Sequence, residues 1–209
     1  MKKALSSTDI LTKKYNLIKW DGSWYDNFKH PESRGIWFIS GNSGNGKTAF
    51  MLQLAKALSK YGRVLYNSLE EGNSLTMQEA WKQQNVAECG RRIQLINESI
   101  SELEIRLDKR QSPDIIIIDS WQYTDLNWER YLLVKRKYHN KLFIFNSQMD
   151  GSKPMGKTAL RVQYDADLKI WVEGFKAFSK GRYLGPEWEK GYIIWKEGAI
   201  KYWGQSTNN

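Results

Sequence analysis

The sequence predicts an α/β fold with a mostly parallel sheet flanked by helices and a C-terminal antiparallel extension. Three observations predict it. Strand-like and helix-like segments alternate from residue 36 to residue 147, four isoleucines stand in a row at Ile115–Ile118, and strand-like segments separated only by turns follow residue 167. Strand–helix alternation is typical of a parallel sheet. A run of β-branched residues disfavours a surface helix and indicates a strand buried on both faces.

The expected elements follow in order along the chain. Strands are expected at 36–40, 64–68, 92–96, 115–118 and 142–147, with helices at 47–61, 74–84, 99–111 and 127–139. The first helix repeats apolar residues at helical spacing and stops at Gly62, and the third is amphipathic. In the extension, strands are expected at 167–173, 191–195 and 198–203. We interpret residues 30–209 as one domain, preceded by an N-terminal arm of residues 1–29.

Length and composition limit the class of protein. A chain of 209 residues with 41% hydrophobic and 26% charged residues suits one globular domain and excludes a disordered chain or a coiled-coil rod. No apolar run approaches the roughly 18 residues of a membrane span, and no secretion signal is evident. We therefore expect a cytoplasmic protein that is not in a membrane. One cysteine, Cys89, and two histidines exclude an internal disulfide and a Cys/His metal site.

Charge and aromatic content give a first positive indication. The net charge is +9, which favours a polyanionic partner, although solubility alone is an equally good explanation. The ten tryptophans and eleven tyrosines are many, and aromatic rings can stack on nucleic-acid bases. Trp37, Trp171 and Trp195 lie inside apolar strand-like runs, so we expect these rings in the core rather than on a stacking surface.

The most specific motif follows the first expected strand. The segment Gly41-Asn42-Ser43-Gly44-Asn45-Gly46-Lys47-Thr48 fits G-x-x-x-x-G-K-[ST] and begins an expected helix. Such a loop turns backbone N–H groups toward phosphate oxygens, and the helix N-terminus adds positive charge. Lys47 is expected to reach the β- and γ-phosphates and Thr48 to ligate Mg²⁺. A plain glycine-rich turn is the alternative, which the flanking elements disfavour. The motif predicts binding of ATP with Mg²⁺.

An acidic residue ends the isoleucine strand. Asp119 directly follows Ile118, at the carboxyl end of the strand, where ligands of open α/β sheets bind. We therefore expect Asp119 to hold Mg²⁺ through its water shell. A cap on the following segment is the alternative. Asp114 lies at the opposite end of the strand, and we give it no chemical role.

Further polar residues follow two other strands. Glu70 and Glu71 come directly after the strand at 64–68, where a carboxylate can orient and deprotonate an attacking water. For Glu71, a capping role at the next helix is a serious alternative. Gln148 ends the strand at 142–147, where its amide can contact a γ-phosphate. Position alone does not decide between the two glutamates.

Together these elements resemble the RecA-like ATPases, a group that includes RecA, RadA, the hexameric DnaB-type helicases and KaiC. The resemblance covers roughly residues 30–200 and includes the strand end Asn146-Ser147-Gln148. It implies Glu70, which follows Ser68-Leu69, as the catalytic carboxylate and Gln148 as the γ-phosphate sensor. The chain shows no helicase N-terminal domain, RadA zinc finger or RecA C-terminal domain. It is most similar to the short RecA-like ATPases of phages and mobile elements, some of which act in single-strand annealing.

The same resemblance extends beyond Gln148. Residues 149–174 resemble the mobile DNA-binding loop of RecA and the strand after it. Residues 149–160 show no apolar period, so we expect a loop that orders on single-stranded DNA, with Lys153, Lys157 and Arg161 on phosphates. An ordinary flexible surface loop is the alternative.

Residues 179–185 resemble a RadA segment whose basic residues reach the nucleotide of a neighbouring subunit. The resemblance implies this role for Lys180 and Arg182, which their spacing would place on one side of an extended chain. A solvated turn is the alternative. A role in the neighbouring site would require a homo-oligomer, either a ring or a filament.

The expected function is an ATPase that acts on single-stranded DNA in recombination, annealing or replication. Its expected partners are single-stranded DNA, further copies of itself and a single-strand-binding protein; if a phage or mobile element encodes it, the expected compartment is the bacterial host cytoplasm. The alternatives are a DnaB-type helicase-like motor, a non-catalytic assembly ATPase and a small-molecule kinase. No arginine-rich kinase lid is evident, and a GTPase would carry Asn-Lys-x-Asp where this chain has Asn146-Ser147-Gln148-Met149.

Overall fold

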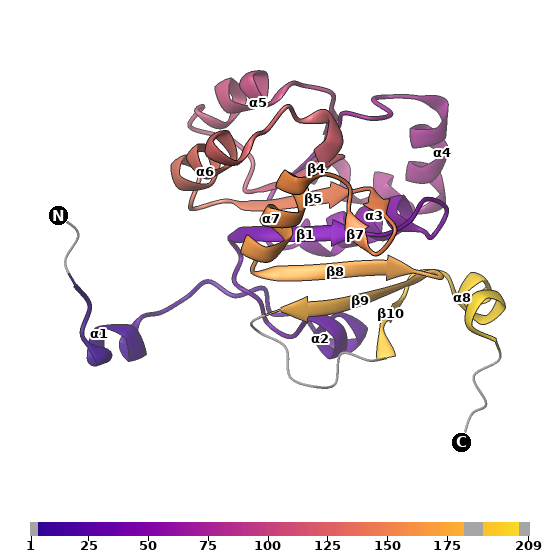
Figure 1. Cartoon of the computed structure of the whole chain (residues 1–209), viewed down its shortest axis with the longest axis horizontal. Helices are drawn as coiled ribbons and strands as arrows, with labels where there is room; N and C mark the ends of the chain where they lie inside the picture. The colour runs from indigo at the N-terminus through magenta and orange to yellow at the C-terminus, as the bar shows by residue number, and fades with distance from the viewer. Residues whose placement is uncertain (1–3, 182–189, 205–209) are drawn as a thin grey trace.

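The computed structural model describes residues 4–181 and 190–204. Within this part of the chain, an eight-stranded sheet has the order β10-β9-β8-β1-β5-β4-β2-β3. Its strands are β1 (Gly35–Ser40), β2 (Val64–Ser68), β3 (Ile93–Ile96), β4 (Ile115–Asp119), β5 (Leu142–Ser147), β8 (Leu168–Glu173), β9 (Lys176–Gly181) and β10 (Tyr192–Ile193). The strands from β8 to β3 in this order are parallel, whereas β9 and β10 are antiparallel to their neighbours, as the arrows of β8 and β9 show (Figure 1). The predicted fold class is confirmed.

Helices cover both faces of the sheet. The four expected helices are present as α3 (Lys47–Leu58), α4 (Leu75–Gln83), α5 (Ile100–Leu107) and α6 (Trp128–Lys137). Two short 3₁₀ segments, η1 (Val86–Arg92) and η2 (Trp121–Tyr123), join them. None of the described helices has the length and apolar character needed to cross a bilayer.

The four isoleucines of β4 explain why the sheet has two cores. Ile115 and Ile117 belong to the cluster beneath α2, α3 and α4, whereas Ile116 and Ile118 belong to the cluster beneath α5, α6 and α7. None of the four is more than 3% exposed. Successive side chains of a strand point to opposite faces, so only a central strand covered on both sides can bury such a run. The interpretation of this strand is confirmed.

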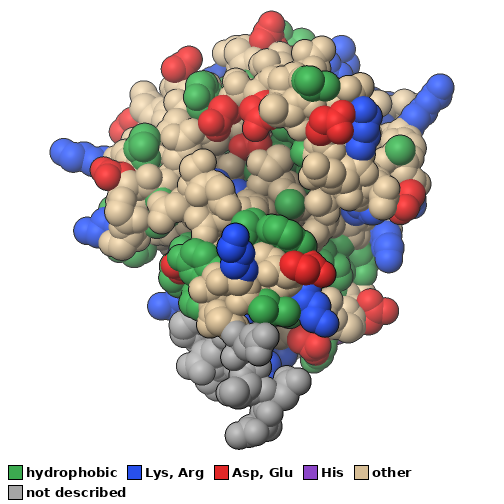
Figure 2. Space-filling view, turned by 90° about the vertical axis from the view of Figure 1, so that its right-hand side faces the viewer, with side chains coloured by type: hydrophobic (Ala, Val, Ile, Leu, Met, Phe, Trp, Pro, Cys, Tyr) green, Lys and Arg blue, Asp and Glu red, His purple; other side chains and the backbone are tan. Residues whose placement is uncertain are grey.

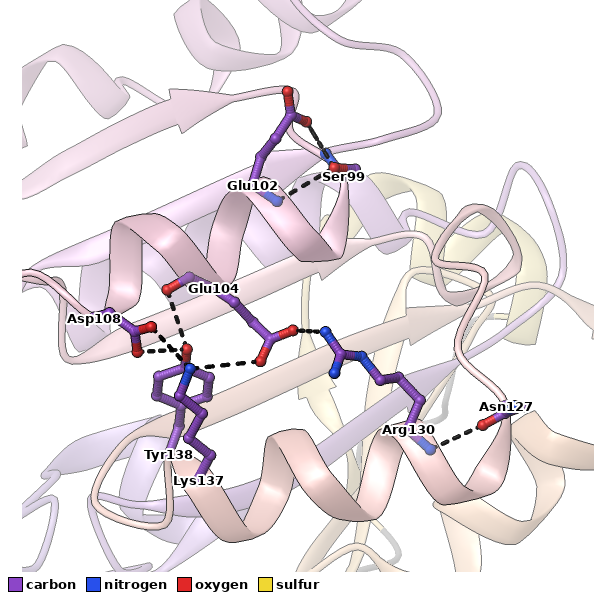
Figure 3. Close-up of polar contacts among 8 residues, drawn as sticks. All are labelled: Ser99, Glu102, Glu104, Asp108, Asn127, Arg130, Lys137 and Tyr138. Atoms are coloured by element: carbon purple, nitrogen blue, oxygen red, sulfur yellow. Dashed lines mark hydrogen bonds and ion pairs between the residues drawn. The ribbon is translucent and has the colours of Figure 1, made fainter.

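Polar contacts hold α5 against α6 on one face (Figure 3). Glu104 of α5 pairs with Arg130 and Lys137 of α6, and Asp108 accepts a hydrogen bond from Lys137 at 2.8 Å. The hydroxyl of Tyr138 contacts Asp108 at 2.9 Å. Ion pairs as exposed as these contribute little stability individually. They fix how the two helices lie on the sheet and leave the carboxyl ends of its strands free.

Two segments differ from the predictions. Residues 149–160, expected as a loop, form the hairpin of β6 (Met149–Asp150) and β7 (Lys153–Pro154) and the start of α7 (Lys157–Asp165). The apolar residues that anchor α7, Ala159 and Val162, mostly fall at or beyond the end of that window. The helix crosses from β5 to β8, so β8 joins β1 in parallel rather than lying wholly in an antiparallel extension.

The expected strand at 198–203 is wrong, because α8 (Lys196–Trp203) occupies it. Its Gly198 lies directly against Trp195, where a Cβ would approach the ring to 2.3 Å. This close packing brings the start of the helix against the aromatic residues at the end of the sheet.

The first part of the chain divides in two. Residues 4–17 are exposed and carry α1 (Ser7–Thr12), which lies apart from the sheet (Figure 1). Ile18, Trp20 and Phe28, the last of these in α2 (Gly22–Phe28), are buried. Residues 18–28 of the expected arm therefore contribute to the core of the domain.

The tryptophans expected in the core are placed differently from one another. Trp37 is fully buried, as expected. Trp171 is 45% exposed and Trp195 is 52% exposed, so the expectation is wrong for both. In β8 the buried residues alternate with Trp171, which lies on the opposite face of the strand. Trp195 precedes α8 instead of lying within a strand.

Candidate active site

The glycine-rich loop between β1 and α3 is built by close packing. Gly44 and Gly46 have φ values of +74° and +92°, which disfavour residues with a side chain. At Gly41, a Cβ would lie 2.2 Å from the carbonyl oxygen of Val172. The Asn45 side chain donates to the carbonyl of Ser43 at 3.1 Å and accepts from the backbone N–H of Gly174 at 2.8 Å. The turn between β8 and β9 thus fixes the loop from outside.

Lys47 lies at the first position of α3 and reaches back into the loop. Its ammonium group donates to the carbonyl of Asn42 at 2.9 Å. Burial lowers the pKa of Lys47, and the carboxylates of Asp119 and Glu70 act in the opposite direction. The cation is therefore held where a phosphate would lie, partly removed from water, with carboxylates nearby.

A cavity of about 580 Å³ opens beside this loop. It is lined by residues from five places in the chain: Ser43, Gly44, Gly46, Lys47, Thr48 and Ala49, then Glu70 and Glu71, Asp119, Asn146, Gln148 and Met149, and Phe175. The view onto this edge of the sheet shows acidic side chains gathered above the centre of the face (Figure 2). The structure thus brings together the predicted loop, both glutamates, Asp119 and Gln148.

Asp119 is held by two hydrogen bonds at the floor of the cavity. Only 6% of the residue is exposed. Its carboxylate accepts from the hydroxyl of Tyr66 at 2.6 Å and from the side-chain amide of Asn146 at 2.7 Å. Burial raises the pKa of Asp119, while both hydrogen bonds act to lower it. The N-cap of η2 is Ser120, so the carboxylate is directed to the cavity and does not cap the next segment.

The donor set fits a hydrated Mg²⁺ ion. Thr48 contributes a hydroxyl and Asp119 a carboxylate, and both line the cavity. The Oδ1 atom of Asn146 is buried without a hydrogen-bond partner among the described residues. Oxygen donors of these types are those that Mg²⁺ takes, with several waters kept in its shell.

The two glutamates after β2 have different surroundings. Glu70 accepts hydrogen bonds from the hydroxyl of Ser120 at 3.1 Å and from the amide of Gln148 at 3.0 Å. Glu71 accepts from the hydroxyl of Thr76 at 2.7 Å, in the first turn of α4. The capping alternative therefore describes Glu71, and Glu70 is the glutamate bonded to the other cavity residues.

Gln122 is a site residue that sequence reasoning missed. Its side chain accepts from the backbone N–H of Gln148 at 3.1 Å and donates to the hydroxyl of Ser147 at 2.8 Å and to the carbonyl of Met155 at 3.1 Å. It thereby connects the end of β5 to the segment that follows the β6–β7 hairpin. Its only signal in the sequence is a polar side chain three residues after Asp119.

The remaining predicted site residues lie outside the cavity. Lys153 and Lys157 are exposed on β7 and at the start of α7, and the guanidinium of Arg161 lies 4.1 Å from the ring centre of Trp128. Lys180 is paired across the strands with Lys169, which lies beside Phe38 in the middle of β1. Arg182 lies outside the described residues.

Comparison with known proteins places this geometry in a known fold. No family model and no curated protein matches the sequence. The flagellar accessory protein FlaH from Methanocaldococcus jannaschii is similar over 83% of this chain and 90% of its own, with a TM-score of 0.59 and 14% identity. The ATPase domain of a phage helicase is similar over 74% of this chain and 79% of its own, with a TM-score of 0.51 and 17% identity.

A third similar structure is the ATP synthase subunit NeqB from Nanoarcheaum equitans. It matches 76% of this chain and 52% of its own, with a TM-score of 0.55 and 12% identity. Identities this low speak for the fold alone. Together with the parallel sheet order and the loop before α3, they show that the chain has the RecA-like P-loop ATPase fold.

Proposed function

We propose that the protein binds ATP with Mg²⁺ and hydrolyses it, and that single-stranded DNA is the partner to which this reaction is coupled. The observation that carries the proposal is the position of Glu70. It lines the same cavity as Lys47 and Asp119 and is hydrogen-bonded to Gln148. A carboxylate positioned beside a phosphate-binding loop is what activation of a water molecule requires.

In the proposed reaction, each group of the cavity has one task. The backbone of the loop and Lys47 hold the phosphates, and Thr48 and Asp119 would hold Mg²⁺, which neutralises charge on the β- and γ-phosphates. Glu70 orients a water and accepts its proton as the water oxygen bonds to the γ-phosphorus. The bond from phosphorus to the leaving oxygen of ADP breaks in the same displacement. Gln148, bonded to Glu70 and attached to β6, responds to the γ-phosphate.

The proposed DNA contact lies on the hairpin and α7. Lys153 and Lys157 are exposed there, and Arg161 lies on the same helix. Met155 donates its backbone N–H to the carbonyl of Gln148 at 2.9 Å. This bond and the Gln122 contacts connect the hairpin to the cavity, so occupation of either site can affect the other, and such coupling is reciprocal. Contacts of this kind to phosphates are salt-sensitive and largely independent of sequence.

Turnover of ATP with and without single-stranded DNA tests the proposal. We expect hydrolysis by the unaltered protein to rise with DNA, and Lys47→Ala to abolish binding or turnover, because the cavity loses its phosphate cation. Lys60→Ala, which removes an exposed lysine after α3, is the matched control and should retain activity. Hydrolysis that DNA does not change would retain the ATPase but remove the DNA partner. An active Lys47→Ala protein would contradict the assignment of the site.

A further inference from the structure

A second hollow lies on the sheet away from the cavity described above. It has a volume of about 560 Å³ and runs between α7 and the β8–β9 pair. Its lining includes Tyr164, Lys169, Trp171, Phe178 and Lys180. We call these five residues the aromatic groove. Tyr164 is 70% exposed and Trp171 is 45% exposed, so large rings face solvent here.

The alternation of β8 produces this surface. Leu168, Ile170 and Val172 point into the core cluster beneath α2 and α3. Trp171 therefore points to the opposite face, and so does its direct cross-strand partner, Phe178. The two rings lie 5.7 Å apart. One face of this strand pair is thus core, and the other is an open aromatic surface beside α7.

Lysines accompany the rings. Lys169 and Lys180 face each other across the strands, two positions from the pair of Trp171 and Phe178. Lys169 also donates to the carbonyl of Ala166 at 3.3 Å. Lys176 lies 5.7 Å from the ring centre of Trp203, which contacts Phe178 at 5.7 Å. Exposed rings flanked by ammonium groups match the two needs of single-stranded nucleic acid, stacking for bases and cations for phosphates.

The position of the groove favours nucleic acid over a second copy of the chain. A copy carries the same net charge of +9, whereas a nucleic-acid strand complements it. The nearest acidic residue along β8, Glu173, already accepts a hydrogen bond from Tyr202 at 2.9 Å. The wall of the groove is α7, which also carries Lys157 and Arg161. A strand on those cations would reach the groove by following the same helix.

We propose that the aromatic groove binds the bases of single-stranded DNA, with Trp171 and Phe178 as the stacking surface. The inference rests on the proposed function for its ligand and adds a base-contacting site to the phosphate contacts of the hairpin. Binding in the groove depends on the presence of bases, whereas binding through Lys153 and Lys157 depends on phosphates alone.

Fluorescence anisotropy with two labelled strands of equal length, an oligothymidine and an abasic strand, separates the two contributions. Trp171→Ala and Phe178→Ala should each weaken binding of the oligothymidine by about tenfold, near the middle of the range for loss of one stacked base. Binding of the abasic strand should stay unchanged, which also shows that the variants are folded. Trp171→Phe should recover most of the loss. Tyr25→Ala, which removes a partly exposed ring on α2, is the control and should bind both strands normally.

The outcomes distinguish this inference from the proposed function. If the unaltered protein prefers oligothymidine and both alanine variants keep that preference, the groove is not the base site, while DNA remains the partner. If groove variants lose self-association but bind DNA normally, the groove is an interface between copies and the inference is overturned. If the unaltered protein binds neither strand but hydrolyses ATP, the DNA partner and the groove proposal both fail. A loss confined to Lys153→Ala/Lys157→Ala would also overturn it.

Discussion

At the scale of single residues, the site depends on partners that lie far apart in the chain. Asp119 and the loop up to Thr48 could be predicted because each forms a contiguous motif. Tyr66 and Asn146 could not, because their role comes from the order of β2, β4 and β5 in the sheet, which places both beside Asp119. The choice between Glu70 and Glu71 likewise required knowing which carboxylate caps α4.

The hydrogen bond from Tyr66 gives a prediction for pH. Burial raises the pKa of Asp119, so its carboxylate takes up a proton at a higher pH than an exposed aspartate does. Because the ionised form is needed to hold Mg²⁺, turnover should fall as the pH drops through this raised pKa. The Tyr66 hydroxyl lowers that pKa, so Tyr66→Phe should raise it further and move the acid limb of activity to higher pH.

The measurement is Mg²⁺-dependent ATP turnover against pH. Tyr131→Phe is the matched control, because it also removes a buried hydroxyl that donates to an aspartate, Asp165, on another part of the sheet. It should leave the acid limb in place. A limb that moves equally in both variants, or that moves to lower pH in Tyr66→Phe, would contradict this role of Tyr66.

At the scale of elements, the sequence predicted those whose patterns are complete within one segment. The buried strand β4 and the amphipathic α5 belong to this group. The errors lie at α7 and α8. The hairpin hides the start of α7 because glycine and proline dominate the preceding residues, and α8 begins in an apolar run that also suits a strand. Tertiary packing decides both, through Val162 under the sheet and Gly198 against Trp195.

The hairpin is connected to the cavity through Gln122, and this connection can be tested. We expect Gln122→Ala to reduce the stimulation of ATP turnover by single-stranded DNA several-fold and to leave most of the DNA-free rate, because the carbonyl of Met155 and the N–H of Gln148 both lose a partner. Gln94→Ala on β3 removes an exposed amide elsewhere and should retain full stimulation. Unchanged stimulation in Gln122→Ala would contradict the coupling, as would an equal loss of both rates.

At the scale of the whole molecule, the cavity contains less positive charge than the proposed reaction needs. Among the described residues that line it, Lys47 is the one cation. Phosphoryl transfer spreads charge over the transferred oxygens, and a second cation commonly stabilises it, with an effect of about 10³–10⁵ on the rate for an arginine finger. We propose that a neighbouring copy supplies this cation from Lys180 and Arg182.

Mixing two inactive variants tests this assembly. Arg182→Ala and Glu70→Gln should each lose nearly all turnover alone. In a mixture, some interfaces pair an intact Glu70 with an intact Arg182, so a substantial part of the activity should return. The amount recovered should follow the fraction of mixed interfaces. No recovery, with co-assembly shown by an independent measurement, would place Arg182 in its own subunit or outside the reaction.

The assignment of Glu70 as the water-activating carboxylate is tested most directly by measuring ATP binding and single-turnover hydrolysis on the same sample of Glu70→Gln. The substitution keeps the size of the side chain and removes its proton-accepting oxygen. We predict that ATP binding is retained while hydrolysis falls by at least about 10²-fold, the lower end of the effect of a general base. Glu71→Gln, which changes the glutamate that caps α4, should hydrolyse ATP at close to the unaltered rate. Normal hydrolysis by Glu70→Gln, together with loss in Glu71→Gln, would contradict the account.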